Sequence, residues 1–368
     1  MSTAQATRSG HRAPPGPTLP ALVQTVAYHR DPLGVLRRAR ARHGPVFTLR
    51  LPDPVVFVAD PQAVGPLVDA GRAGSARRTI LPLASPRSLF GADDGEHRML
   101  RAELEPRFNA IDGEAIAAIA REHIATWPRG TPFRLLPRMR SLSSEVFARV
   151  ILGLASSAEY VAAVRKLLRT PGNPPLPVPG DALTARVFRR RAAPLIRLLE
   201  QAGLDSDRWL VVIAAGQEPP SIALTNVAYE LARHPEHQLD EAFTNEVLRL
   251  RPSASALLRE LTEETAIAGY TLAPGTTVAL SSPLLHRDPV AFPAPDELRP
   301  GRPTEGVPYF PFGGGTRRCI GEPLARAQLR TVLPLLPRLR AVWPRPERMV
   351  VRGTVLVPHR SAIVSTAG

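Results

Sequence analysis

Two kinds of feature are nearly or wholly missing from the sequence. Cys319 is the only cysteine in 368 residues, so no disulfide can form within the chain and the fold must depend on packing. No apolar run near the start is long enough for a secretory signal or a membrane-spanning helix. We therefore expect a cytoplasmic protein that is not inserted into a membrane.

Lysine is almost absent as well. Lys166 is the only lysine among 47 basic residues, and the arginines are spread along the chain with 41 prolines. Such a spread is typical of biased gene composition rather than of a nucleic-acid-binding tail, and no nucleic-acid-binding module accompanies it. The formal net charge of +14 therefore does not predict a nucleic-acid partner.

Apolar residues at helical spacing predict a mainly α-helical chain with a small β-region. Residues 1–15 are expected to form a disordered tail and residues 16–368 a single domain, because no repeat or linker divides them. Helices are expected over 31–44, 60–71, 95–108, 111–127, 138–155, 188–203, 209–233 and 240–250. Strands are expected at 45–51 and 55–59, a hairpin over 266–282 around residues 273–275, and loops over 75–92 and 170–181.

The stretch 312–321, FGGGTRRCIG, places features around the single cysteine that favour a thiolate. Arg317 and Arg318 precede Cys319, and helical sequence begins at or just after it, so positive charge and a helix N-terminus both act on the sulfur. Glycines at 313–315 let the backbone turn tightly and leave room for a large planar ligand. A structural cysteine and a protease-type thiol are alternatives, but no histidine is singled out as a partner. We favour a metal or cofactor ligand.

These residues resemble the haem-binding loop of the cytochrome P450 family, and the following GEPLARAQL continues the match. The matching positions are Phe312, Gly313, Gly315, Arg317, Cys319 and Gly321. Further motifs follow the family's order over nearly the whole chain. The resemblance implies the cytochrome P450 fold, with haem b (iron protoporphyrin IX) between the long distal helix and the helix after the cysteine loop, and with Cys319 as iron ligand.

A structural motif of the family is matched before the cysteine loop. Glu246 and Arg249 resemble its E-x-x-R helix, and Arg302 resembles the arginine that closes this buried triad. The spacing of three residues puts Glu246 and Arg249 on one helical face, where a carboxylate and two guanidiniums satisfy one another. In isolation such a pair is usually a solvated ion pair, so its place in the order of motifs carries the interpretation.

The resemblance also assigns partners for the haem propionates. His97 and Arg101 resemble the family's H-x-x-x-R motif, and a spacing of four stacks both side chains on one helical face. Arg259 and Arg317 occupy the positions of two further propionate arginines. Four donors are thus expected to converge on two carboxylates.

The distal helix departs from the family pattern Ala/Gly-Gly-x-Asp/Glu-Thr-Thr. Gly216 and Glu218 are kept, but Pro219 and Pro220 replace the two threonines. Proline has neither hydroxyl nor N–H and costs about 3 kcal/mol inside a helix, so a kink or break is expected. We interpret the change as altered oxygen or proton handling, with protons from Glu218, Ser221, water or the substrate. The alternative is a tolerated bulge with Pro219 at the start of a resumed helix.

The pocket is inferred only by position in the family. The connection over 204–207 is short, so a thin lid is expected, with the entrance formed by 81–88 and 174–179. Small residues on the wall would suit a bulky substrate. The residues predicted to line the pocket are Ala215, Gly216, Glu218, Ala254, Ser255 and Ala256.

The resemblance implies a haem-thiolate oxidoreductase of the monooxygenase class that tailors a small organic molecule, such as a bacterial secondary metabolite. A monomer is expected, with electrons supplied by an acidic ferredoxin-type protein that docks on arginines near Cys319. Because Pro219 replaces the threonine, peroxide-driven oxidation, oxidative coupling, dehydration and nitrene-type chemistry stay open. A haem protein that binds without turnover is the remaining alternative.

Overall fold

The computed structural model describes residues 13–51, 53–68, 73–75, 88–154, 158–168, 182–343 and 345–366. Most of the predicted tail, the loop over 170–181 and nearly all of the predicted entrance lie outside these residues. At the edge of the predicted tail, Thr48 donates hydrogen bonds to the carbonyls of Pro14 and Pro15, at 2.8 and 2.9 Å. These two prolines therefore lie against the first strand.

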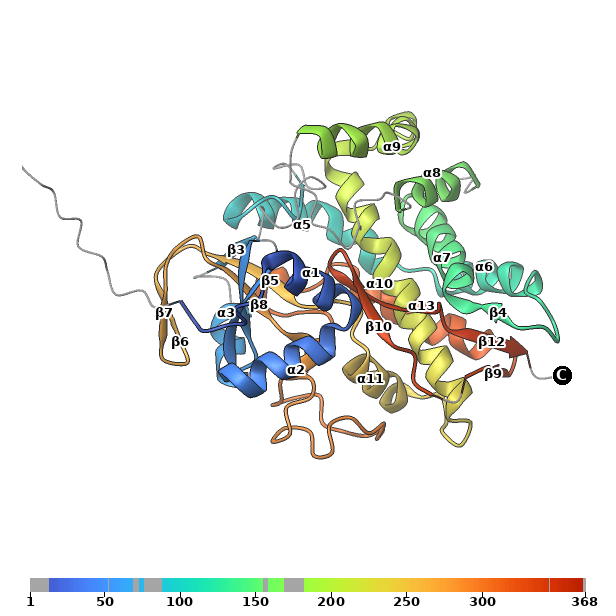
Figure 1. Cartoon of the computed structure of the whole chain (residues 1–368). Coiled ribbons are helices and arrows are strands. Elements are labelled where there is room, and N and C mark those ends of the chain that lie inside the picture. Colours follow the sequence, from blue (N-terminus) through green and yellow to red (C-terminus); the bar gives the residue numbers. More distant parts are fainter. Residues whose placement is uncertain are drawn as a thin grey trace, which may run out of the picture.

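The prediction of a mainly helical chain with a small β-region is confirmed (Figure 1). The α-helices are α1 (Ala21–Arg30), α2 (Pro32–His43), α3 (Val64–Val68), α5 (Asp94–Asn109), α6 (Gly113–Ala125), α7 (Leu135–Val146), α8 (Ala158–Leu168), α9 (Ala182–Gln201), α10 (Ser206–Arg233), α11 (Glu241–Leu250), α12 (Ser282–Leu285) and α13 (Glu322–Val332). Shorter turns are the 3-10 helices η1 (Pro61–Ala63), η3 (Gly315–Arg317) and η4 (Leu333–Leu335) and the π-helix η2 (Phe147–Ile151).

Aspartate side chains begin several of these helices. Asp31, Asp112, Asp205 and Asp240 each accept a backbone N–H from the first turn of the helix that follows. Such caps satisfy donors that have no partner within the helix. The sequence thus sets where α2, α6, α10 and α11 start.

Within the described residues, the strands form one sheet of five and three smaller sheets. The strands are β1 (Val46–Arg50), β2 (Pro54–Val58), β3 (Ala73–Ser75), β4 (Phe133–Arg134), β5 (Leu257–Leu261), β6 (Thr265–Ile267), β7 (Tyr270–Leu272), β8 (Thr277–Leu280), β9 (Leu339–Ala341), β10 (Met349–Arg352), β11 (Val355–Pro358) and β12 (Ile363–Thr366). The large sheet has the order β1-β2-β8-β5-β3, and only its β2–β8 pair is parallel. The small sheets are β10-β11, β4-β12-β9 and β6-β7.

Both faces of the large sheet are buried, as the alternation along β2 shows. Val55 and Phe57 join a core cluster with Leu36 of α2, whereas Val56 and Val58 join a separate cluster on the other face. Successive strand residues point to opposite faces, so a run of apolar residues serves two cores at once. The sheet is fixed beside the much larger core that the helices build.

The predicted hairpin around residues 273–275 is wrong. The turn lies earlier, at Ala268 and Gly269, whose φ angles of +46° and +83° join β6 to β7. Two consecutive residues with positive φ suit a two-residue hairpin. The segment 273–275 instead leads into β8, which pairs with β5 and β2.

A kink or a break was expected at Pro219, and the break is wrong, because α10 continues as one helix from Ser206 to Arg233 through Pro219 and Pro220. It passes through the middle of the molecule and packs against α7, α9, α11 and α13 (Figure 1). Residues 220–230 are all buried in this packing. Proline's fixed φ is itself helical, so burial along a long helix can hold the two prolines in place while two hydrogen bonds are lost.

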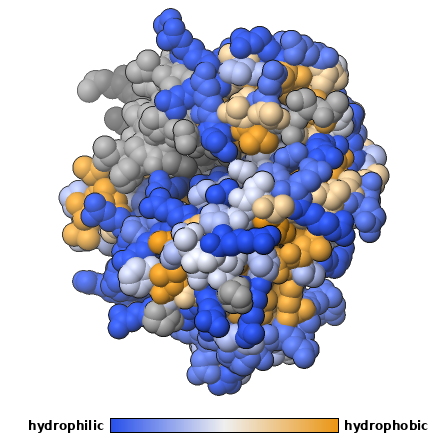
Figure 2. All heavy atoms as spheres, turned by 90° about the vertical axis from the view of Figure 1, so that its right-hand side faces the viewer, coloured by the Kyte–Doolittle hydropathy of each residue, from blue (hydrophilic) through white to orange (hydrophobic). Residues whose placement is uncertain are grey.

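Among the described residues, no helix combines the length and the apolar character needed to cross a bilayer. Figure 2 shows that the face on the right-hand side of Figure 1 is mostly hydrophilic, with separate apolar patches between charged groups.

Candidate functional site

The loop before α13 is closed on itself by backbone hydrogen bonds. The Cys319 N–H donates to the Phe312 carbonyl at 2.9 Å, and the Gly313 N–H donates to the Phe310 carbonyl, also at 2.9 Å. One turn of 3-10 helix, η3, lies between them. The backbone of the loop therefore helps to hold the position of Cys319.

Glycine is required in this loop for two different reasons. Gly313 and Gly315 have φ angles of +71° and +62°, which residues with a Cβ seldom adopt. Gly314 has an ordinary φ, but a Cβ there would lie 2.7 Å from Cγ1 of Val68. At Gly321 an added Cβ would be 3.8 Å from the Cys319 sulfur, so nothing in the protein fills that space tightly.

Cys319 is exposed, although protein surrounds its sulfur on several sides. Burial raises the pKa of the thiol, while hydrogen bonds from the Gly321 and Glu322 backbone and the charge of Arg101 act to lower it. α13 begins at Glu322, three residues after the cysteine rather than directly at it. The sulfur thus meets N–H groups at a helix start, an arrangement that stabilises a thiolate once a metal cation is present.

Four residues assigned to propionate binding lie in one region. His97 is 6% exposed, and the pKa of its imidazole is lowered to about 4 by burial and by the charges of Arg317, Arg101 and Arg259, against the opposing charge of Asp93. Electrostatic interactions of this size act over short distances inside a protein. The fold therefore brings residues from α5, β5 and the cysteine loop to the same place.

Arg259 is the member of this group that most needs an anion. Its side chain is buried, and burial together with the charge of Arg317 lowers its pKa to about 10. Within the described residues its guanidinium hydrogen-bonds only the Leu258 carbonyl, at 3.0 Å, and pairs with no carboxylate. A desolvated cation is costly unless an anion balances it, so the region fits a ligand with carboxylates, as haem has.

Arg101 and Arg317, the two other arginines of this group, are held by hydrogen bonds and an ion pair with the protein itself. Arg317 pairs with Asp93 and donates to the Ala92 carbonyl at 2.9 Å. Arg101 donates to the Arg318 carbonyl at 2.6 Å, directly before the cysteine. These contacts tie α5 to the cysteine loop.

Glu246, Arg249 and Arg302 form a buried ion-pair network. Arg249 donates to both oxygens of Glu246, at 2.7 and 2.8 Å, and Arg302 donates to the same carboxylate at 3.1 Å. The remaining donors of Arg249 bind the carbonyls of His286, Pro295 and Glu297. Glu246 and Arg249 are each only 1% exposed, and full hydrogen bonding makes this burial tolerable.

On α10, the predicted distal residues turn in different directions. A Cβ on Gly216 would lie 2.6 Å from the Phe147 ring, so that side of the helix faces η2. Glu218 pairs with Arg140 of α7 at 2.6 Å. The Ser221 hydroxyl donates to the Glu218 carbonyl of its own helix at 2.8 Å. Ala215 and Pro219, four residues apart, share a separate face.

Of the three residues after α11 that were predicted to form the pocket wall, the middle one makes hydrogen bonds to other parts of the protein. Ser255 is 7% exposed, donates to the Thr354 carbonyl at 3.1 Å and hydrogen-bonds the buried Tyr28 phenol. The Ser255 hydroxyl is therefore used in hydrogen bonds on the sheet side of the protein. Ala254 forms a β-bridge with Val355, and Ala256 packs near the same apolar cluster as Tyr28.

Sequence reasoning missed several residues around α10. Ser253 donates to the Pro219 carbonyl at 3.0 Å and Arg140 pairs with Glu218. Gln217 is buried and donates to the Tyr160 hydroxyl at 3.0 Å. Ser253 directly precedes the predicted wall residues, so the sequence could have indicated it. No spacing rule connects Arg140 or Tyr160 to α10.

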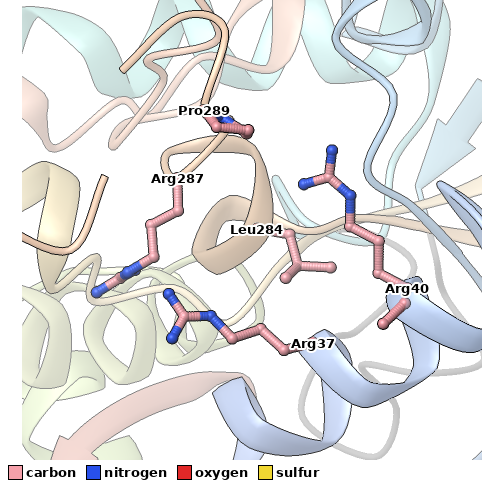
Figure 3. Close-up of a pocket in the computed structure, with 6 residues that line it drawn as sticks. Arg37, Arg40, Leu284, Arg287 and Pro289 are labelled. Atoms are coloured by element: carbon pink, nitrogen blue, oxygen red, sulfur yellow. The ribbon is translucent and has the colours of Figure 1, made fainter. Parts of the chain in front are cut away.

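A separate cavity of about 400 Å³ lies between α2 and the segment after α12 (Figure 3). Arg37 and Arg287 point toward one another across it, and both pair with Asp296. Arg40 lies on another side and pairs with Asp288 at 3.2 Å. None of the residues assigned to haem or substrate lines this cavity.

Comparison with known proteins gives consistent results. The family model described as cytochrome P450 matches residues 239–338, which include the ion-pair network and the cysteine loop. A Mycobacterium tuberculosis protein provisionally named cytochrome P450 135B1 is 30% identical, over 95% of this chain and 90% of its own length. Another from the same species, provisionally named cytochrome P450 135A1, is 27% identical over 95% of this chain and 94% of its own.

Solved structures share the fold. A cyanobacterial CYP120A1 with retinoic acid bound superposes with a TM-score of 0.82 over 97% of this chain and 99% of its own, at 20% identity. A six-coordinated cytochrome P450 from Thermus thermophilus gives a TM-score of 0.76 over 92% of this chain and 99% of its own, at 26% identity.

Proposed function

Because the chain belongs to the cytochrome P450 family, we propose that it is a haem-dependent monooxygenase acting on a small organic molecule, with Cys319 as the iron ligand. Membership indicates a haem-thiolate oxidoreductase. The monooxygenase reaction, haem b as the form of the cofactor and a secondary metabolite as substrate are the finer parts of the proposal.

The observation that carries the proposal is the pairing of an exposed sulfur with a buried cationic group. Cys319 is exposed on a closed loop, and Arg259 lies buried without a carboxylate partner in the described part of the chain. A ligand that brings both a metal and carboxylates would satisfy both. Thiolate-bound haem supplies oxygen activation, because the sulfur donates electron density that favours cleavage of the O–O bond.

On the cysteine side of the proposed haem site, the residues of the protein would bind and orient the cofactor. Gly321 and Glu322 stabilise negative charge on the sulfur through their backbone N–H groups. His97, Arg101, Arg259 and Arg317 would hold the propionates, with Arg317 fixed in place by Asp93. Glu246, Arg249 and Arg302 form a buried support that is linked to the start of the loop through His286. Arg249 donates to the His286 carbonyl, and the His286 ring accepts the Phe310 N–H.

A second candidate is peroxide-driven or other non-monooxygenase chemistry, and Pro219 is the observation that favours it. The face shared by Ala215 and Pro219 carries no hydroxyl at either position. Glu218 is held by Arg140 and Ser221 donates within its own helix, so neither is free to take over without rearrangement. Protons for the reaction would then come from water or from the substrate.

An acidic ferredoxin-type protein is the proposed electron donor. Arg98 and Arg330 are exposed, and the side chain of Arg318, next to the cysteine, is 57% exposed. Exposed arginines on α5, on α13 and beside the cysteine suit an acidic partner and would make its association fall with rising salt. We also propose that the protein acts as a cytoplasmic monomer.

The test of the haem-thiolate proposal uses the single cysteine. The haem-loaded protein is reduced with dithionite and exposed to carbon monoxide, and the red-shifted Soret band of thiolate ligation is recorded. Cys319→Ala should lose this band, because no second thiol exists in the chain to replace it. Retention of the band in the variant, or failure of the wild type to take up haemin, would remove the assignment.

A turnover assay separates the candidates. One sample receives a surrogate ferredoxin with its reductase, and another receives hydrogen peroxide, with a panel of candidate substrates in each. Product with ferredoxin and oxygen supports the monooxygenase, and product with peroxide alone supports the second candidate. Haem binding without product under either condition would indicate a binding protein.

A further inference from the structure

Two backbone carbonyls of α10 lose their regular hydrogen-bond donors. In an α-helix the carbonyls of Ala215 and Gly216 accept from the N–H groups of residues 219 and 220. Both are prolines, and the helix nevertheless continues through them. Proline rings also crowd the carbonyl four residues earlier, so that carbonyl tilts off the helix axis and becomes reachable by an external donor.

The same stretch is a partly exposed section between two buried sections of the helix. Residues 211–213 and 220–230 are buried, whereas Ala214, Ala215, Gly216, Glu218 and Pro219 are each partly exposed. Phe147 closes the side of the helix at Gly216. Arg140 binds Glu218 on another side, so the face of Ala215 and Pro219 is not closed by either of these contacts, and it is the face expected to lie toward haem.

Nearby hydroxyl groups do not replace the missing donors. Ser221 donates to the Glu218 carbonyl at 2.8 Å, Thr225 donates to the Ser221 carbonyl at 2.6 Å, and Ser253 donates to the Pro219 carbonyl at 3.0 Å. Each of these bonds serves a carbonyl that comes after Ala215 and Gly216. Within the part of the chain that the structure describes, no hydrogen bond from a side chain or from outside α10 reaches either carbonyl, so two acceptors of partly exposed residues are left without their regular donors.

We propose that the carbonyl oxygens of Ala215 and Gly216 form an acceptor site that selects ligands carrying a hydrogen-bond donor, a hydroxyl or an N–H. This inference rests on the proposed function, since it places the pair beside the haem. The proline substitutions then have a positive role, because they turn a catalytic hydroxyl position into a specificity element. Substrates of this enzyme would be alcohols, phenols or amines rather than pure hydrocarbons.

The test compares imidazole with 1-methylimidazole, two iron ligands of which only the first carries an N–H. Affinities for the haem-loaded protein are read from the optical shift that each ligand causes. Pro219→Ala and Pro220→Ala restore one helical donor each, while Pro194→Ala removes a proline inside α9 and serves as control. The preference for imidazole over 1-methylimidazole should fall about threefold to tenfold in the distal variants, the worth of one hydrogen bond.

Each outcome is decisive. A preference that falls in Pro219→Ala or Pro220→Ala but not in Pro194→Ala supports the acceptor site. An unchanged preference in both distal variants, with normal haem content and helical circular dichroism, overturns it and leaves the haem proposal intact. If the haem-loaded wild type lacks the red-shifted carbon monoxide band, the proposed function itself fails.

Discussion

The cysteine side and the distal side of the proposed haem site differ in how closely their residues match the family's motifs. On the cysteine side, cationic side chains from α5, β5 and the loop before α13 lie in one region, and α11 carries a separate buried ion-pair network. The residue types on this side match the family's motifs. On the distal side, α10 keeps its path through the core while Pro219 and Pro220 replace the family's threonines. The difference indicates that holding the cofactor tolerates little change, whereas what happens above it can vary on an unchanged helix.

The largest expected effect is a loss of stability when the buried ion-pair network on the cysteine side is broken. Glu246→Ala leaves Arg249 buried and without its carboxylate, and breaking one partner of a buried pair costs about 3–5 kcal/mol. Urea unfolding would measure the loss. Glu297→Ala is the matched control, because its pair with Arg299 is exposed on both sides and such pairs contribute about 0–1 kcal/mol. Equal losses in the two variants would contradict a special role for the buried network.

The next prediction concerns pH and His286, which also belongs to the cysteine side. Its ring is fully buried and accepts the Phe310 N–H at 3.0 Å, and burial with the nearby Arg287 lowers its pKa to about 3. Between about pH 6.5 and that value the unfolded chain binds a proton that the folded chain does not, so acid destabilises the fold.

From pH 7 to pH 5 this group alone should remove about 2 kcal/mol of unfolding free energy. His286→Gln should lessen the acid-dependent loss by that amount in urea unfolding, whereas His359→Gln at an exposed position should not. The same pH dependence in His286→Gln as in the wild type would show that His286 is not the responsible group.

Replacing Arg259 should have a smaller effect, which combines faster loss of haem with no loss of stability in the haem-free protein. Arg259→Gln removes one propionate donor, so the rate of haem transfer to an excess of a haem-scavenging protein should rise about tenfold, as expected for one charge-assisted hydrogen bond. Because its cation is buried without a carboxylate in the described residues, the haem-free protein should not lose stability. Loss of stability without faster haem transfer would indicate a purely structural arginine.

Sequence could predict the cysteine side because its chemistry is encoded locally. Gly313, Gly315 and Cys319 lie within one loop, and Glu246 and Arg249 within one helical turn, so spacing alone places each group. The fold class followed from helical periodicity and from the order of motifs.

The distal side was harder to predict because tertiary packing overrides local preference there. Proline propensity argued for a broken helix at Pro219, yet burial along α10 keeps it continuous. The partner of Glu218, Arg140, lies 78 residues away on α7, and no local pattern connects them. The hairpin was misplaced for a related reason, because Ala268 takes a positive φ that its residue type does not suggest.

The last prediction tests whether the distal prolines changed the chemistry at all. Pro219→Thr restores both the family's hydroxyl and a helical N–H, so the share of reducing equivalents that ends in product should rise a few-fold if proton delivery is what the proline removed. Pro219→Ala restores only the N–H, and any difference between the two variants therefore belongs to the hydroxyl. Pro194→Thr in α9 controls for replacing a helical proline. If turnover, coupling and products stay the same in all three variants, residue 219 has no part in proton handling, and the contrast between the two sides would be one of sequence and not of mechanism.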